Sequence, residues 1–238
     1  MTSRDTNAGS PAGGQTPPTR MRLYSGRLSM FGAKVQIAAL EKGLDCHVVM
    51  VPFDQAYEPK HPEVVRVNPR QQVPVLLHGA VEIFDSTQIF EYFEDVQPTP
   101  ALWPAPGAAR ALARQWEMKS DEVYFPHIVK LMGLQLQLDS PVALAAQAAA
   151  QRFYGEVEAQ LKGRDYLAGA YSYADIAFYM AQFFGARLGA PTTTATPTLL
   201  QWRARMTQRP AVADVVGPMV EFLRESGRVV PAYLERDF

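Results

Sequence analysis

The chain has 238 residues, 47% of them hydrophobic, with 23 basic and 24 acidic side chains. This length accommodates one large domain or two modest ones, and the near-neutral charge argues against general nucleic-acid or membrane-surface binding. We therefore expect a small or peptide-like ligand and not a nucleic acid or a membrane surface. The single cysteine, Cys46, excludes an internal disulfide and a cysteine metal cluster, and its apolar neighbours predict a buried, inert thiol.

Residues 1–20 are rich in Gly, Pro, Ser and Thr and predict a disordered tail. They show no signal-peptide pattern, and no apolar run reaches the roughly 18 residues that span a bilayer, so we expect a cytoplasmic protein. Residues 21–97 predict a strand at 21–24, a helix at 32–42, a strand at 46–51, a helical turn near Glu63, a hairpin through His78-Gly79 and a helix from Asp85-Ser86. This order is βαβ-α-ββα, an α/β domain with a parallel βαβ unit.

Residues 98–107 contain four prolines and predict a stiff linker. The pattern beyond it, 108–238, predicts an all-helical domain with helices over about 108–138, 142–161, 198–206 and 210–223. A further helix is expected to begin at Ser172, because Ser172-Tyr173-Ala174-Asp175 has the pattern of a capping box.

Two dipeptides in the first domain indicate a ligand site. Pro74 has no N–H to donate, so it belongs at the start of a strand or on an edge, and an edge would leave the Val73 backbone free to pair with an extended ligand. Asp85 and Ser86 cap a helix whose first N–H groups suit a carboxylate, while Asp85 suits an ammonium group. An extended ligand with both charges at one end, as in an amino acid, fits this pattern.

The strings NPRQQVPVL and FDSTQIFEYFED together resemble the glutathione site of cytosolic glutathione S-transferases, in particular bacterial serine-type (theta/tau-like) members, with some similarity to bacterial β-etherase relatives. The resemblance implies a thioredoxin-like first domain, a helical-bundle second domain, glutathione as co-substrate and no metal. It implies that Pro74 is cis, that Val73 pairs with the cysteinyl backbone of glutathione, and that Asp85 and Ser86 hold the γ-glutamyl end. It assigns Gln72 to the ligand and Lys60, or else His61, to the glycine carboxylate.

The resemblance also places a thiol-activating group just after the first strand. Ser29-Met30-Phe31 stands where related members have a serine before the first helix, so Ser29 is the preferred catalytic residue, with Ser25 and Tyr24 as alternatives. The loop has no cysteine, which disfavours thiol-exchange chemistry.

The acceptor substrate is expected against the helical half, with candidate residues Trp116, Tyr124 and His127 near Lys119, Glu122 and Phe125. The leading hypothesis is a homodimeric enzyme that activates glutathione as a thiolate for attack on a small electrophilic, hydrophobic substrate. Two alternatives stay open. One is a non-catalytic glutathione-binding or interaction protein on the same scaffold, and the other is a glutathione-dependent β-etherase or dehalogenase.

Overall fold

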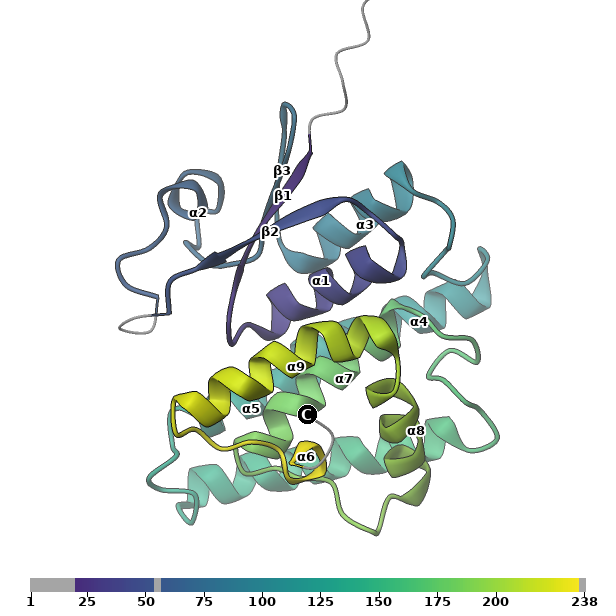
Figure 1. Ribbon diagram of the computed structural model, residues 1–238. Helices are drawn as coiled ribbons and strands as arrows, with labels where there is room; N and C mark the ends of the chain where they lie inside the picture. The colour runs from purple at the N-terminus through teal and green to yellow at the C-terminus, as the bar shows by residue number, and fades with distance from the viewer. Residues whose placement is uncertain (1–19, 54–56, 236–238) are drawn as a thin grey trace, which may run out of the picture.

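The computed structural model describes residues 20–53 and 57–235, so almost all of the expected tail at 1–20 lies outside the described residues (Figure 1). The first half contains a four-stranded sheet in the order β2-β1-β3-β4. The strands are β1 (Met21–Gly26), β2 (Cys46–Val51), β3 (Val75–His78) and β4 (Val81–Phe84). β1 runs parallel to β2 and antiparallel to β3, and β3 and β4 form the expected hairpin.

Three helices cover the two faces of this sheet: α1 (Met30–Glu41), α2 (Pro62–Val67) and α3 (Ser86–Val96). Successive side chains of a strand point to opposite faces. Leu23 and Leu76 accordingly pack against α1 and α3, while Tyr24 and Val75 pack toward α2. Figure 1 shows α2 on the side of the sheet opposite α1 and α3. The arrangement is thioredoxin-like and confirms the predicted fold class of the first domain.

The second half is helical, also as predicted. Its elements are α4 (Ala108–Met118), a π-helical segment (Lys119–Tyr124), α5 (Phe125–Met132), α6 (Pro141–Leu161), α7 (Tyr173–Arg187), α8 (Pro197–Thr207), α9 (Pro210–Glu225) and a 3-10 turn (Ala232–Leu234). The single helix expected over 108–138 is thus interrupted and ends at Met132. Pro126 explains the interruption, because proline removes an N–H from the helical ladder and the chain before it widens into a π turn.

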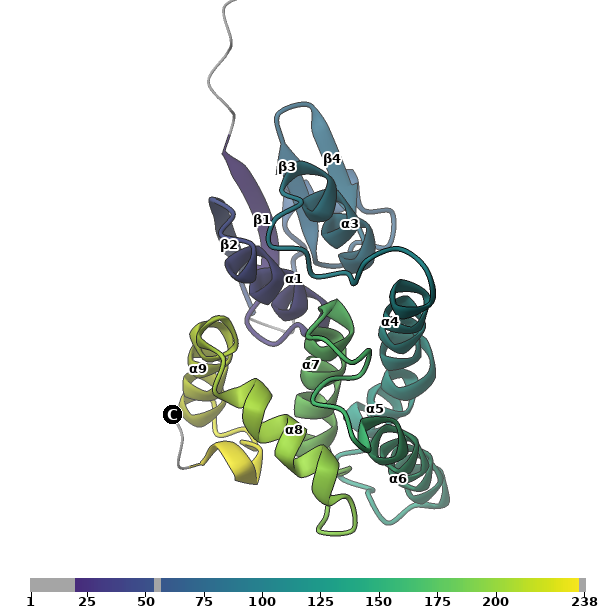
Figure 2. The ribbon, with the colours of Figure 1, turned by 90° about the vertical axis from the view of Figure 1, so that its right-hand side faces the viewer.

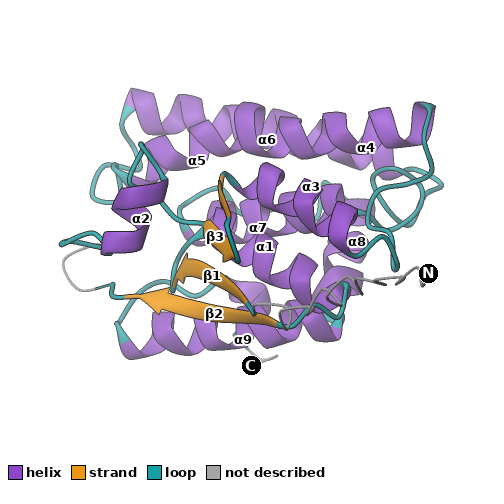
Figure 3. Cartoon of the chain, turned by 90° about the horizontal axis from the view of Figure 1, so that it is seen from above, coloured by secondary structure: helices purple, strands orange, loops and turns teal. Residues whose placement is uncertain are grey.

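Helix α1 lies between the sheet and the helical domain and is buried on both sides. Figure 2 and Figure 3 show α7 between α9 and the group formed by α4, α5 and α6. At the start of α7, Ser172 and Asp175 form the expected capping box. The Asp175 carboxylate also accepts hydrogen bonds from Leu167 N at 3.0 Å and Trp202 Nε1 at 2.9 Å. This residue therefore joins three segments of the helical core.

The proline-rich stretch at 98–107 contains no helix or strand and is anchored by buried charge. Lys42 Nζ donates to Glu94 Oε1 at 2.6 Å and to the Pro100 carbonyl at 2.8 Å, and Glu94 accepts from Leu102 N at 3.0 Å. These bonds tie the connection to α1 and α3. Across the described ranges, no helix combines the length and apolarity needed to cross a bilayer.

Candidate active site

Ser29 lies in the loop between β1 and α1 and is the N-cap residue of α1. Its Oγ accepts a hydrogen bond from Gly32 N at 3.0 Å. A hydroxyl carries one donor besides its acceptor lone pairs, so this cap leaves the Ser29 proton available to another group. Gly32 is needed here for space, because a Cβ at this position would lie 2.1 Å from Ser25 Oγ. Ser29 thus presents a hydroxyl at a helix N-terminus, where negative charge is favoured.

The other two serine-type candidates lie elsewhere. Ser25 is fully buried and accepts a hydrogen bond from Gln36 Nε2 at 2.8 Å. Tyr24 is 4% exposed and packs its ring against His61 at a centroid distance of 4.8 Å. Of the three candidates, Ser29 is the one that lines the cavity described next.

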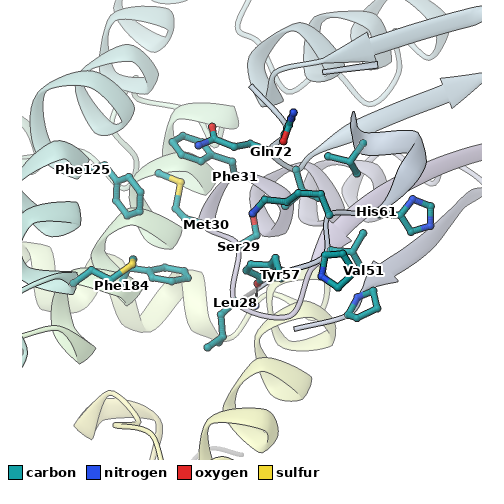
Figure 4. A pocket seen from close by; sticks show the side chains of 17 residues that line it. Leu28, Ser29, Met30, Phe31, Val51, Tyr57, His61, Gln72, Phe125 and Phe184 are labelled. Atoms are coloured by element: carbon teal, nitrogen blue, oxygen red, sulfur yellow. Dashed lines mark hydrogen bonds between the residues drawn. The ribbon is translucent and has the colours of Figure 1, made fainter. Parts of the chain in front are cut away.

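A cavity of about 290 Å³ opens beside Ser29 (Figure 4). Three parts of the chain form its wall: the loop and first turn of α1, the loops around α2 and before β3, and the helical domain. In Figure 4, Phe125 and Phe184 of the helical domain face Ser29 from the side opposite His61 and Val51. The lining residues used below are Leu28, Ser29, Tyr57, Lys60, His61, Gln72, Val73, Phe125, Met132 and Phe184.

A second cavity of about 520 Å³ adjoins the first, and Phe31, Gln72 and Val73 line both. Its further lining comprises Pro74, Asp85, Ser86, Thr87, Glu117, Asp121 and Glu122, together with Asn68 and Arg70. The two cavities form one elongated site that runs from Ser86 past Val73 to Ser29. All six residues predicted to bind glutathione line these cavities: Lys60 lines the first, Pro74, Asp85 and Ser86 line the second, and Gln72 and Val73 line both.

The Val73-Pro74 peptide bond is cis. β3 begins at Val75 and is an inner strand of the sheet. Pro74 therefore stands at a strand start, which is one of the two predicted positions, and does not lie on an edge strand. The Val73 backbone is nevertheless available for another reason. Ladder pairing starts only at Val75, and among the described residues Val73 N–H and C=O have no hydrogen-bond partner. Asn68 holds this loop through a 2.6 Å bond from its Nδ2 to the Gln72 carbonyl.

Asp85 occupies a strained backbone conformation with φ 77° and caps α3. Its Oδ1 accepts from Thr87 N at 3.0 Å and Gln88 N at 3.2 Å, so these first N–H groups, which we expected to be free for a ligand, are already bound. Ser86 lines the cavity and is only 2% exposed, and its carbonyl accepts from Tyr173 Oη at 3.2 Å. Strain of this kind persists where surrounding structure holds it, which is common at binding sites.

A buried ion cluster closes the far end of the elongated site. Lys34 is 0% exposed, donates to Glu117 Oε1 at 2.8 Å and also contacts Asp121. Asp121 Oδ1 is buried without a hydrogen-bond partner, and Asp121 lines the cavity beside Asp85. Burial, reinforced by the Glu117 charge, raises the pKa of Asp121 to about 6 although Lys34 opposes the shift. The sequence carries one weak signal for this cluster, the acidic pair at positions 117 and 121 on one helical face.

The opposite end of the site is basic and aromatic. Lys60 lines the cavity and pairs with Glu58 at 3.0 Å, and His61 caps α2 by accepting from Glu63 N at 3.2 Å. Sequence reasoning missed Tyr57, whose hydroxyl accepts from Leu28 N at 3.0 Å. Burial raises the pKa of Tyr57 to about 12, so its hydroxyl remains a neutral donor at pH 7.

The predicted acceptor residues lie outside the cavity wall. Trp116 and Tyr124 are buried in the helical core, where Tyr124 Oη and Tyr154 Oη are 2.5 Å apart. His127 is half-buried, and burial with the nearby charges of Lys130 and Arg152 lowers its pKa. Phe125, which lies next to Tyr124 in the sequence, does line the cavity. Within residues 20–53 and 57–235, no group of three or more His, Cys, Asp or Glu side chains is placed to hold a metal ion.

Curated relatives of the chain include the following three proteins. "Glutathione S-transferase 1" of Dianthus caryophyllus is 40% identical over 96 residues, which cover 40% of this chain and 43% of the relative. "Probable glutathione S-transferase parC" of Nicotiana tabacum is 28% identical over 200 residues, covering 78% and 84%. "Protein LigF" of a Sphingobium strain is 36% identical over 116 residues, covering 48% and 44%. The matches therefore span less than half of the first and third relatives.

A solved glutathione S-transferase from Rhodospirillum rubrum F11 has the same fold, with a TM-score of 0.78 and 26% identity over 92% of this chain and 100% of that one. The family model for the glutathione S-transferase N-terminal domain matches residues 23–101, and the model for the C-terminal domain matches residues 118–210. Both models, in this order, coincide with the thioredoxin-like and helical halves described above. The chain belongs to the glutathione S-transferase family.

Proposed function

We propose that this chain is a glutathione transferase in which Ser29 stabilises the thiolate of bound glutathione for attack on an electrophilic carbon. One observation carries the proposal. A single elongated site connects the Asp85-Ser86 cap with the Ser29 hydroxyl at the N-terminus of α1, which caps the helix and still has its proton to donate. The Val73 backbone, which has no hydrogen-bond partner among the described residues, lies between them.

Glutathione has a chemical group for each part of this site. Its γ-glutamyl carboxylate fits the Ser86 hydroxyl and N–H, and its α-ammonium fits the carboxylates of Asp85 and Asp121. Its cysteinyl backbone is positioned to pair with Val73 in the manner of an added strand. Its glycine carboxylate fits Lys60, with His61 beside it. This placement leaves the sulfur near Ser29.

The energies needed are available locally. A thiol with a pKa near 8.5 is only a few per cent ionised at pH 7, and lowering that pKa by about two units requires about 2.7 kcal/mol. A hydrogen bond to a charged group contributes about 1.5–3 kcal/mol, and a helix N-terminus up to about 2 kcal/mol. Ser29 and the N-terminus of α1 together are sufficient, so no general base is required.

In the reaction with an aryl halide, the thiolate sulfur forms a bond to the electrophilic carbon, and the halide leaves with the electron pair of the broken bond. With an enone, the sulfur adds to the β-carbon, the C=C π bond breaks, and the resulting enolate takes a proton from solvent. The apolar walls at Leu28, Phe125 and Phe184 suit a hydrophobic acceptor. The comparisons do not favour the non-catalytic alternative or the β-etherase and dehalogenase alternatives. The homodimer and the cytoplasmic location that the resemblance implies stay predictions.

Initial-rate kinetics with glutathione and a panel of activated aryl halides and enones test the proposal. Ser29→Ala should lower kcat/KM by about 10- to 100-fold, the loss of one charge-assisted hydrogen bond. Ser140→Ala is the matched control, because Ser140 Oγ caps α6 in the same way, accepting from Ala143 N at 3.3 Å, and Ser140 is absent from the cavity walls. Absence of any glutathione-dependent product with the wild type would refute the proposal.

A further inference from the structure

The cavity beside Ser29 continues into a third space, of about 560 Å³, on the side of the helical domain. Leu28, Tyr57, Met132 and Phe184 line both. The additional lining includes two arginines, Arg187 from the last turn of α7 and Arg228 from the turn after α9. A molecule that reacts beside Ser29 and extends away from the glutathione end therefore reaches these two cations.

Among residues 20–53 and 57–235, the buried cation Arg187 has no carboxylate as an ion-pair partner. It is 8% exposed, and its Nε is buried with no hydrogen-bond partner. Among the described residues, no carboxylate lies within 4.0 Å of Arg187 or Arg228. The buried cations Lys34 and Lys42, by contrast, each pair with a glutamate. Buried charges are normally paired, so the guanidinium of Arg187, which lines this space, is suited to bind an anionic group of a ligand.

Arg228 adds a second positive charge to the same wall. Its guanidinium carbon lies 5.1 Å from the centre of the Phe53 ring, and this ring packs edge-on against Tyr57 at 4.6 Å. Burial, together with the charge of Arg228, lowers the pKa of Arg187 to about 10, so Arg187 is still a cation at pH 7. Two like charges on one wall strengthen the attraction for an anionic ligand.

We propose that the acceptor substrate of this enzyme is an aromatic or otherwise apolar electrophile that carries a carboxylate, and that Arg187 binds this carboxylate with Arg228 beside it. The inference rests on the transferase function proposed above and names the class of substrate. The apolar side chains of Leu28, Met132 and Phe184 hold the body of the substrate between Ser29 and the arginines. The planar fork of a guanidinium matches a carboxylate with two parallel hydrogen bonds.

A competing role for Arg187 is purely structural, since a cation in the last turn of a helix also interacts with the helix C-terminus. That role makes no demand on the charge of the substrate. A matched pair of acceptors separates the two: 4-chloro-3-nitrobenzoate and its neutral amide, 4-chloro-3-nitrobenzamide. In both, the thiolate sulfur forms a C–S bond, the C–Cl bond breaks, chloride leaves with the electron pair, and the thiol proton has passed to solvent.

We compare kcat/KM for both acceptors in wild type, Arg187→Met, Arg187→Lys and Arg228→Met. Each value is divided by the rate constant of the uncatalysed reaction of the same acceptor. Arg22→Met is the control. Arg22 is exposed on β1, so this substitution removes the same positive charge at a position away from the cavity. Wild type and control should favour the benzoate. Arg187→Met should lower kcat/KM for the benzoate by about 10- to 100-fold, the range of one charge-assisted hydrogen bond, and that for the amide by less than about twofold. Equal losses for both acceptors, or no preference in wild type, would overturn the proposal.

If neither acceptor is turned over, that result counts against the transferase function alone. The proposed carboxylate site is then tested by the binding of the two reaction products. Calorimetry with the S-(4-carboxy-2-nitrophenyl) conjugate of glutathione and with its carboxamide should show about tenfold tighter binding of the carboxylate to wild type, lost in Arg187→Met. Equal affinities would overturn the proposal. If Arg187→Met fails to unfold cooperatively, the same comparison of carboxylate and carboxamide is made with the other two variants. Arg187→Lys retains the positive charge, and Arg228→Met leaves the buried Arg187 in place.

Discussion

Replacing Lys34 by methionine is expected to destabilise the protein strongly, because it removes the one cation from a buried cluster of charges. Lys34 is fully buried, and the Glu117 and Asp121 side chains around it are 6% and 9% exposed. The two carboxylates outweigh the effect of burial and raise the pKa of Lys34, so the ammonium is charged at all ordinary pH values. Methionine has a similar length and keeps the packing, so the substitution isolates the charge.

The structure bounds the size of the effect. At an effective dielectric constant of about 20, the 2.8 Å pair between Lys34 and Glu117 has a gross attraction of about 6 kcal/mol. An orphaned carboxylate escapes part of this loss by taking up a proton, which at pH 7 costs about 3.7 kcal/mol for a glutamate of ordinary pKa. The net cost at pH 7 should therefore be about 3–5 kcal/mol, as for other buried pairs broken on one side.

The effect should also depend on pH in a defined direction. In the variant, the orphaned carboxylates have folded-state pKa values raised above their unfolded values, so the folded state holds protons that the unfolded state has released. The stability of the variant should then fall as pH rises from about 5 to 7, by up to about 2.7 kcal/mol for each carboxylate.

Urea denaturation at pH 5, 6 and 7, followed by circular dichroism, measures this. Lys130→Met is the control, because Lys130 is exposed on α5 and has no ion pair among the described residues. This substitution should change stability by less than about 0.5 kcal/mol. A loss below about 1 kcal/mol in Lys34→Met at pH 7, or a loss that does not vary with pH, would refute the reasoning.

Three further substitutions have defined outcomes. Asp175→Ala leaves buried donors without their acceptor, including Trp202 Nε1, and should cost about 3–5 kcal/mol in urea denaturation; a cost under about 1 kcal/mol would contradict its place in the helical core. Gly32→Ala places a Cβ 2.1 Å from Ser25 Oγ and should lower both the melting temperature and kcat/KM, whereas unchanged kinetics would show that the start of α1 adapts. In wild type, KM for glutathione should rise as pH falls through about 6, because protonation of Asp121 removes charge that attracts the α-ammonium. Asp121→Asn should have a high KM that no longer varies with pH over this range, and a wild-type profile in the variant would exclude the residue from binding.

The parts of the fold that follow from local pattern were predictable. The strands, α1 and the Ser172 cap are encoded by residue spacing and capping chemistry within single segments. The prediction of one continuous helix over 108–138 was wrong at its centre and at its end. Helix propensity there favours a continuous helix, and Pro126 interrupts it by removing one N–H from the hydrogen-bond ladder of the backbone. The choice between a strand start and an edge strand at Pro74 could not be made from the sequence, because strand order depends on pairing between distant segments.

The candidate site likewise contains residues that local motifs predict and residues that they do not. Ser29, Val73 and the Asp85-Ser86 pair lie within short motifs and were identified from them. Asp121, Tyr57 and Arg187 were missed because their significance arises from contacts between remote segments, such as that between Lys34 and Asp121 across 87 positions. The aromatic residues of the helical half could not be sorted from the sequence, since Phe125, which lines the cavity, and Tyr124, which is in the core, are adjacent.

The central claim is that Ser29 stabilises the thiolate of bound glutathione, and the pH titration of enzyme-bound glutathione by thiolate ultraviolet absorbance tests it most directly. In wild type and in Ser140→Ala, the bound thiol should titrate about two units below free glutathione, and in Ser29→Ala its pKa should return upward by about one to two units. An unchanged, low pKa in Ser29→Ala would contradict the claim and move the activating role to another group. A pKa equal to that of free glutathione in the wild type would contradict thiolate activation altogether.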